Sequence, residues 1–68
     1  MLMQIDKSRA IMIATRFFGQ YNSDISLKDA ILEGDVWIVT VYTGMMNKKT
    51  KQVAIDANNG KILSNIQF

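Results

Sequence analysis

The segment Val36–Thr43 constrains the fold more than any other part of this sequence, because it consists of β-branched and aromatic residues. Such residues favour an extended strand, where their side chains pack on a pleated surface. Successive side chains of a strand point to opposite faces. Both faces are therefore largely apolar, which predicts a central strand of an antiparallel sheet. One face carries Trp37, Val39 and Val41, and the other carries Val36, Ile38, Thr40 and Tyr42.

The N-terminal segment, residues 5–21, has the periodicity of an amphipathic helix. Asp6 or Ser8 can cap its first turn, and Gly19 favours its termination. Arg9, Arg16 and Gln20 fall on the side that we expect to face water, together with Met12. The apolar stripe comprises Ala10, Ile13, Ala14, Phe17 and Tyr21, with Ile11 and Phe18 on one flank.

The remaining segments predict further strands joined by turns. Residues 25–32 have an ambiguous period and are interpreted as a strand, followed by a turn in which Gly34 supplies a positive φ. Residues 44–50 predict a loop, and residues 52–57 a strand that places Val53, Ile55 and Ala57 on one side. Asn58-Asn59-Gly60 is a strong hairpin signal. A last strand follows, with Ile62, Ser64, Ile66 and Phe68 alternating with Leu63, Asn65 and Gln67.

These segments together predict a single α+β domain, residues 1–68, with the helix packed on one face of a three- to four-stranded antiparallel sheet. One helix covers one face only. The other face, which carries Ile38 and Tyr42, is then exposed or buried against a partner. The predicted core consists of Ala10, Ile13, Ala14, Phe17, Trp37, Val39, Val41, Val53 and Ile55.

The chain contains no cysteine and no histidine, which removes disulfides and the common zinc sites as supports for a small core. A core of this size rarely supplies more than about 3–5 kcal/mol alone, so we expect tight packing or completion by a second copy in a homodimer. Charged residues interrupt any signal-like apolar run, and no run reaches the length of a membrane span. We expect a soluble domain or the soluble part of a larger protein.

The residue types argue against catalysis, because the commonest general base and the commonest strong nucleophile are both missing. Asp29, Glu33 and Asp35 lie close in sequence, but the interpretation we favour is a solvated turn. The segment 56–60 resembles the start of a calcium loop but lacks the closing acid, because position 67 is Gln67. We therefore predict no enzyme activity, no cofactor and no metal.

The predicted loop after Thr43 joins two methionines to a cluster of lysines. It is interpreted either as a solvated loop whose lysines protect strand edges or as a contact for phosphates or an anionic membrane surface. Nucleic-acid binding is not expected, because the loop has no interleaved aromatic residues and the net charge is only +2. The candidate interface consists of Ile38, Tyr42, Met45, Met46, Lys48, Lys49 and Lys51.

Two motifs resemble the PepSY domain family. Trp37, Val39 and Val41 match its W-x-V-x-V strand, and spaced alanines at Ala10 and Ala14 match its helix. The second motif follows in the right order, with matches at Val53, Ile55, Asp56, Ala57, Gly60, Lys61 and Leu63. The layout is also similar to that of cystatins, but their Q-x-V-x-G inhibitory loop is absent, so their mechanism is not transferred.

The PepSY resemblance implies a module that inhibits or restrains a peptidase, at the cell envelope or outside the cell. Without that resemblance, the missing export signal favours a cytoplasmic location. Three hypotheses follow for the function of the chain. It docks on a protein partner such as a peptidase, it self-associates through the open sheet face, or it binds anionic surfaces through the lysines of the loop.

Overall fold

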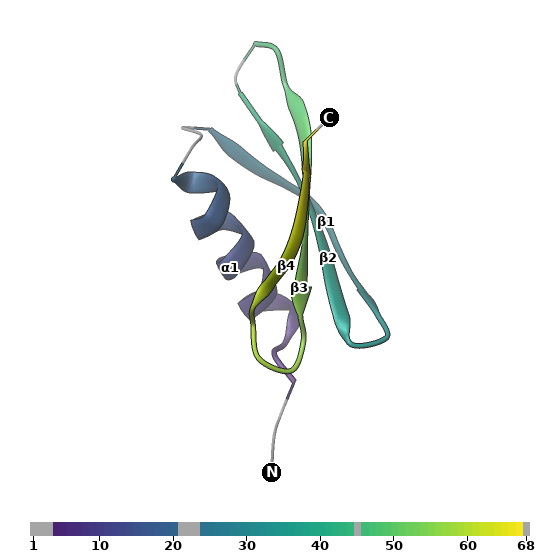
Figure 1. Ribbon diagram of the computed structural model, residues 1–68. Coiled ribbons are helices and arrows are strands. Elements are labelled where there is room, and N and C mark those ends of the chain that lie inside the picture. Colours follow the sequence, from purple (N-terminus) through teal and green to yellow (C-terminus); the bar gives the residue numbers. More distant parts are fainter. Residues whose placement is uncertain (1–3, 21–23, 45, 68) are drawn as a thin grey trace.

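The structure is a computed structural model that describes residues 4–20, 24–44 and 46–67. The four strands form one antiparallel sheet in the order β1-β2-β3-β4, and helix α1 lies across one of its faces (Figure 1). The predicted α+β layout is therefore confirmed. Along these residues the elements are α1 (Lys7–Gly19), β1 (Ile25–Glu33), β2 (Val36–Thr43), β3 (Lys49–Asp56) and β4 (Ile62–Gln67).

Helix α1 begins after Asp6, whose carboxylate accepts a hydrogen bond from the backbone N–H of Arg9 at 2.8 Å. Its fully buried residues are Ala10, Ala14 and Phe18, spaced by four positions, whereas Ile13 and Phe17 are half-buried. The burial of Ala10 and Ala14 was predicted, whereas Phe18, which was placed on the flank, is buried more deeply than Phe17. Two alanines at the centre let the helix backbone approach the sheet closely, and the larger side chains fit at the margins. Tyr21 lies outside the described residues.

The core lies between α1 and the helix-facing side of the sheet. Antiparallel pairing puts Val39 opposite Val53 and Trp37 opposite Ile55, so the apolar sides of β2 and β3 form one surface. Ala30 of β1 pairs with Val39 and extends this surface toward the sheet edge. The buried apolar residues are Ala10, Ala14, Phe18, Ala30, Trp37, Val39, Val41, Val53, Ile55 and Ala57.

Strand β1 contains a bulge at Lys28, which explains the ambiguous period of this segment. Leu27 pairs with Val41, but Asp29 already pairs with Thr40, so Lys28 is an extra residue. An extra residue reverses which positions face the helix. Up to Leu27 the odd-numbered positions face α1, and from Ala30 onward the even-numbered positions do so.

Two predicted details of the C-terminal hairpin are wrong. Strand β3 begins at Lys49, so residues 49–51, which include two of the loop lysines, belong to the strand. In β4, Ile62 pairs with Ile55 and Ser64 pairs with Ala54, which makes Leu63 an extra residue. Ile62 therefore does not share a side with Ser64 and Ile66 as the simple alternation predicts.

The segment before α1 is attached to the sheet at Ile5. Its backbone N–H donates to the carbonyl of Ala57 at 2.7 Å, and its own carbonyl accepts from the Trp37 indole N–H at 2.9 Å. Ala57 in turn donates from its backbone N–H to the carbonyl of Asp35 at 2.7 Å. The entry to the helix, the β1–β2 turn and the end of β3 are thereby held together.

Candidate binding face

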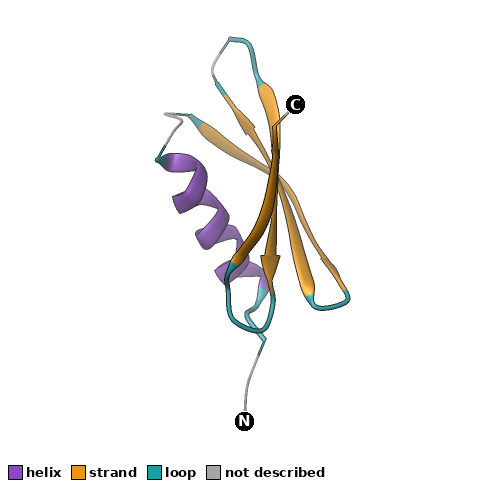
Figure 2. Cartoon of the chain, in the orientation of Figure 1, coloured by secondary structure: helices purple, strands orange, loops and turns teal. Residues whose placement is uncertain are grey.

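The face of the sheet that points away from α1 carries the strand side chains that do not pack in the core. Within the described residues no helix covers it (Figure 2). Strand pairing brings residues from all four strands into cross-strand rows on this face. One row contains Ile31, Ile38, Ala54 and Ser64, and the next contains Asp29, Thr40, Gln52 and Ile66.

A shallow, open groove of about 450 Å³ runs over β1, β2 and β3 on this face. Its charged residues all come from β1, whereas the positions from β2 and β3 are uncharged. The open face therefore has an uncharged centre and a charged margin. The groove is lined by Lys28, Asp29, Ile31, Glu33, Ile38, Thr40, Thr50 and Gln52.

The floor of the groove is a hydrogen-bonded pair. Thr40 is buried although its strand face has no helix above it, and its hydroxyl oxygen accepts from the Gln52 side-chain amide at 3.2 Å. Every buried side-chain nitrogen or oxygen in the described part of the chain has a hydrogen-bond partner. The groove thus offers no unsatisfied buried polar atom to fix a small ligand, and its chemistry suits a broad contact.

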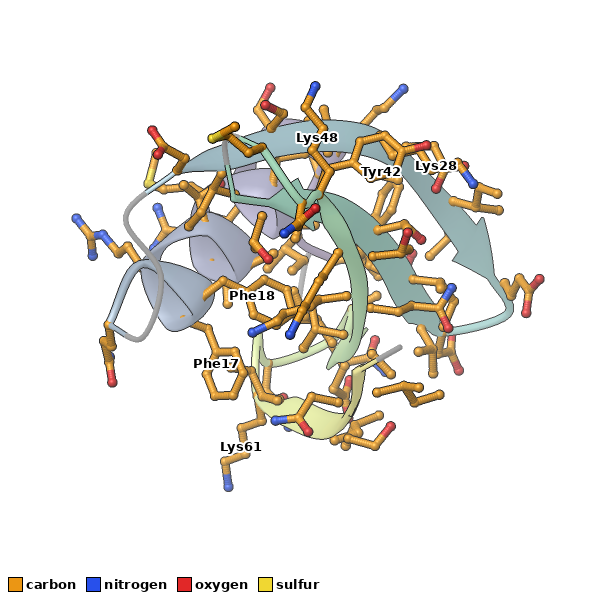
Figure 3. All side chains as sticks on the ribbon, turned by 90° about the horizontal axis from the view of Figure 1, so that it is seen from above. Phe17, Phe18, Lys28, Tyr42, Lys48 and Lys61 are labelled. Carbon is orange, nitrogen blue, oxygen red and sulfur yellow. The ribbon has the colours of Figure 1, made fainter. Side chains whose placement is uncertain are left out.

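Apolar side chains project from this face on both sides of the groove floor. Ile31 of β1 is 51% exposed and Ile66 of β4 is 47% exposed, while Ile38 and Tyr42 are half-buried. Figure 3 shows Tyr42 and Lys28 on the side of the sheet opposite to Phe18, which points into the core. An apolar surface with a polar rim is the usual anatomy of a protein interface.

The predicted loop residues do not form one patch. Met46 is 94% exposed, and Lys48 and Lys49 are also exposed. Lys51 is only 9% exposed, because it pairs with Val41 on the helix-facing side of the sheet. Lys49 pairs with Thr43 and shares that side. Met45 lies outside the described residues.

Asp29, Glu33 and Asp35 do not form one cluster of carboxylates in the described structure. Asp29 and Glu33 lie four residues apart on β1, which corresponds to roughly 13 Å along a strand. The carboxylate of Asp35 accepts a hydrogen bond from the Gln4 side-chain amide at 2.9 Å. No group of three or more acidic residues that could hold a metal ion occurs among the residues the structure covers.

The segment that resembles a calcium loop forms a closed hairpin turn. The Asp56 carboxylate accepts from the backbone N–H of Asn58, and the Asn59 side-chain oxygen accepts from that of Lys61, both at 2.8 Å. Gly60 has a φ of 76°, which glycine adopts without strain. These side chains are occupied in shaping the turn.

Reasoning from the sequence missed Ile31, Ile66 and the charged margin around Lys28 and Glu33. The alternation on the β2 side of the face was visible, because β2 is a regular strand. Bulges at Lys28 and Leu63 shift the alternation in the two flanking strands. In β1 the sequence contained one signal of the bulge, because its apolar residues lie at odd positions before Lys28 (Ile25, Leu27) and also at even positions after it (Ala30, Leu32).

Comparison with known proteins adds no identification. No family model matches the chain, and neither a curated protein nor a solved structure matches it. In the part of the chain covered here, no helix has the length and apolar character required to cross a membrane.

Proposed function

We propose that the chain is a non-enzymatic protein-binding module that docks on a partner protein through the open face of its sheet. The observation that carries this proposal is the uncharged centre of that face, flanked by the exposed side chains of Ile31 and Ile66, which no described element covers. Burial of such side chains against a partner removes apolar surface from water, which favours association. The charged residues of β1 at the margin would then orient the partner.

The partner class that we propose to test first is a peptidase, on the basis of the PepSY resemblance. The residues that carry this resemblance have structural roles here. Trp37 holds the segment before α1, and Asp56 and Gly60 shape the hairpin turn. A regulatory contact would therefore use the open face of the sheet, whose fold those motif residues stabilise.

Adjacent residues of β1 provide a matched pair of variants for this proposal. Ile31 lies on the open face and is 51% exposed, whereas Leu32 lies on the opposite face and is 43% exposed. A charge at Ile31 should weaken binding because it would be desolvated in the interface. The same charge at Leu32 should leave binding unchanged while imposing a similar cost on the strand.

The experiment measures binding and inhibition of purified peptidases, with thermolysin-like enzymes first, by the wild-type chain, Ile31→Lys and Leu32→Lys. We expect wild type and Leu32→Lys to bind or inhibit alike and Ile31→Lys to lose at least about tenfold in affinity, or 1.4 kcal/mol. Binding that is equal for both variants would place the contact elsewhere. Failure with every peptidase class would reject the peptidase assignment.

A homodimer through the same face is a second candidate. Its specific support is the mixture of charges at the margin, where Lys28 lies on the same strand as Asp29 and Glu33. A two-fold interface brings each margin against its own copy, so opposite charges can pair. Sedimentation should then give a dimer at high micromolar concentration for wild type and Leu32→Lys and a monomer for Ile31→Lys. A wild-type monomer would exclude it.

Binding to anionic surfaces is supported less well, because Lys51 is buried on the helix-facing side and only Lys48 and Lys49 remain exposed in this segment. Two lysines contribute a weak and strongly salt-dependent attraction. Retention on anionic vesicles or DNA at low salt, lost in Lys48→Gln/Lys49→Gln, would favour this function over protein docking.

A further inference from the structure

The outer edge of β4 is an open position in the sheet. Strand order places β4 at one edge and β1 at the other, so no described strand pairs with the outer side of β4. Among the described elements, α1 packs on β1, β2 and β3 and not on β4. An edge strand presents backbone N–H and C=O groups that can pair with another chain.

The two edges differ in how well they are protected. Strand β1 carries Lys28, Asp29 and Glu33 along its length and a bulge at its middle. Strand β4, Ile62–Gln67, has no charged residue and no proline, and its bulge lies at its start. Natural sheets use charges, proline and bulges to prevent unwanted pairing, so β4 is the edge that remains available.

The hydrogen bonds of the hairpin identify the free backbone groups. The Asp56 N–H donates to the carbonyl of Lys61 at 2.8 Å, so Asp56 faces β4. In an antiparallel strand every second residue faces the same neighbour, so Ala54 and Gln52 also face β4 and bond with their partners Ser64 and Ile66. The backbone groups of Asn65 between them therefore point outward.

Basic side chains line the space between α1 and the β3–β4 turn, next to the start of β4. A groove of about 490 Å³ is lined by Arg9 and Arg16 from α1, and its lining includes no acidic residue and no residue of β4. These arginines are two helical turns apart, or roughly 10 Å along the axis. Lys61 extends from the hairpin on the side where Phe17 lies (Figure 3). The remaining lining residues are Ile5, Met12, Ile13, Asn59 and Gly60.

We propose that the edge of β4 binds an extended acidic segment of a partner as a fifth strand. Its backbone would pair with Asn65, its acidic side chains on the helix side would face Arg9 and Arg16, and its apolar side chains would meet Ile66. Acidic residues at alternate positions of this added strand would all lie on its helix side. A second copy of this chain would bring basic residues against basic residues. This site is distinct from the open face and does not depend on the function proposed for it.

The test uses a fluorescein-labelled heptapeptide of alternating glutamate and valine, with an alternating lysine and valine peptide as the comparison. We expect the glutamate peptide to bind the full chain with a Kd below about 1 mM at low salt, and the lysine peptide at least about tenfold more weakly. Amide NMR shifts of the wild-type chain should move at Asn65 and Gln67, and much less on β1.

Variants at one position separate backbone pairing from side-chain contact. Asn65→Pro removes the outward N–H without removing a donor of the β3–β4 ladder, and Asn65→Ala keeps it. Peptide affinity should fall at least about tenfold in Asn65→Pro and by no more than about twofold in Asn65→Ala. Arg9→Gln/Arg16→Gln, at exposed helix positions, should weaken it about fivefold or more, because two charge-assisted contacts are lost.

The proposal is overturned by any of three results: no binding of the glutamate peptide, NMR shifts confined to other strands, or equal binding of both peptides. A wild-type dimer that Asn65→Pro dissociates would also overturn it, since the occupant would then be a second copy. Ile31→Lys should leave peptide binding unchanged, so failure of this site is distinguishable from failure of the open face.

Discussion

The Trp37 indole N–H donates to the backbone carbonyl of Ile5 at 2.9 Å, across 32 residues of sequence. This bond joins the central strand of the sheet to the segment that leads into α1. Trp37 is 9% exposed, so its ring fills the core while its one polar atom is satisfied by the backbone. A single residue thus packs the core and fixes where the helix begins.

Replacement of Trp37 by Phe should destabilise the chain by about 1–2 kcal/mol, because it removes this hydrogen bond and part of the ring volume. Urea unfolding followed by circular dichroism measures the effect, since Trp37 is the only tryptophan and fluorescence is lost with it. Gln4→Ala, which removes an exposed bond to Asp35, should cost less than about 0.5 kcal/mol. Equal losses of stability in Trp37→Phe and Gln4→Ala would mean that the Trp37–Ile5 bond contributes no more than an exposed hydrogen bond.

Asp6→Ala should lower the free energy of unfolding by about 1 kcal/mol, because Asp6 caps α1 through the Arg9 N–H. Asp6→Asn should retain most of that stability, since asparagine is an equally good cap. Ser8, the alternative cap suggested by the sequence, lies inside the helix and Ser8→Ala should be nearly neutral or slightly stabilising. Thermal unfolding of the three variants distinguishes the two assignments.

Gly60→Ala should cost more stability than Gly34→Ala. Both glycines have a positive φ, which costs alanine about 1–2 kcal/mol. At Gly34 a new Cβ meets no atom within 4 Å, whereas at Gly60 it would lie 3.3 Å from Cδ1 of Ile13. The Ile13→Val background lacks that Cδ1, so there the Gly60→Ala penalty should fall toward the Gly34→Ala value. An unchanged penalty in the double-mutant cycle would contradict the contact.

Lys51→Ala should destabilise the chain by about 1 kcal/mol, because the aliphatic stem of Lys51 is buried on the helix-facing side. Lys49→Ala, two residues earlier on the same side of β3, removes an exposed side chain and should stay within about 0.5 kcal/mol of wild type. Urea midpoints at constant m-value provide the comparison. Equal stability changes in Lys51→Ala and Lys49→Ala would mean that the Lys51 side chain is exposed to solvent like that of Lys49.

Regular elements were the part of the fold that could be predicted from the sequence. Strand β2 has the predicted bounds, and Gly34 in the β1–β2 turn has the predicted positive φ of 60°. Both depend on local chemistry: a continuous run of strand-forming residues and a residue that tolerates the left-handed region. The solvent-exposed face of α1 was also predicted correctly, since Arg9, Arg16 and Met12 are exposed.

The candidate site was predicted only in part, because its outer strands contain bulges. Ile38 and Tyr42 lie on the open face as alternation along β2 requires. Lys51 was assigned to a loop, although pairing with Val41 places it inside β3. Cross-strand pairing decides where a strand begins, and a residue's own propensity carries no information about its partner.

Local sequence chemistry therefore specified the helix, the central strand and the turns, since each depends on the preferences of neighbouring residues. Tertiary packing decided which residues of α1 meet the sheet, where Lys28 and Leu63 interrupt the ladders, and which face and edge remain open. These features depend on contacts between segments that are distant in sequence, such as that of Trp37 with Ile5. The surfaces proposed for binding are what remains after those contacts have formed.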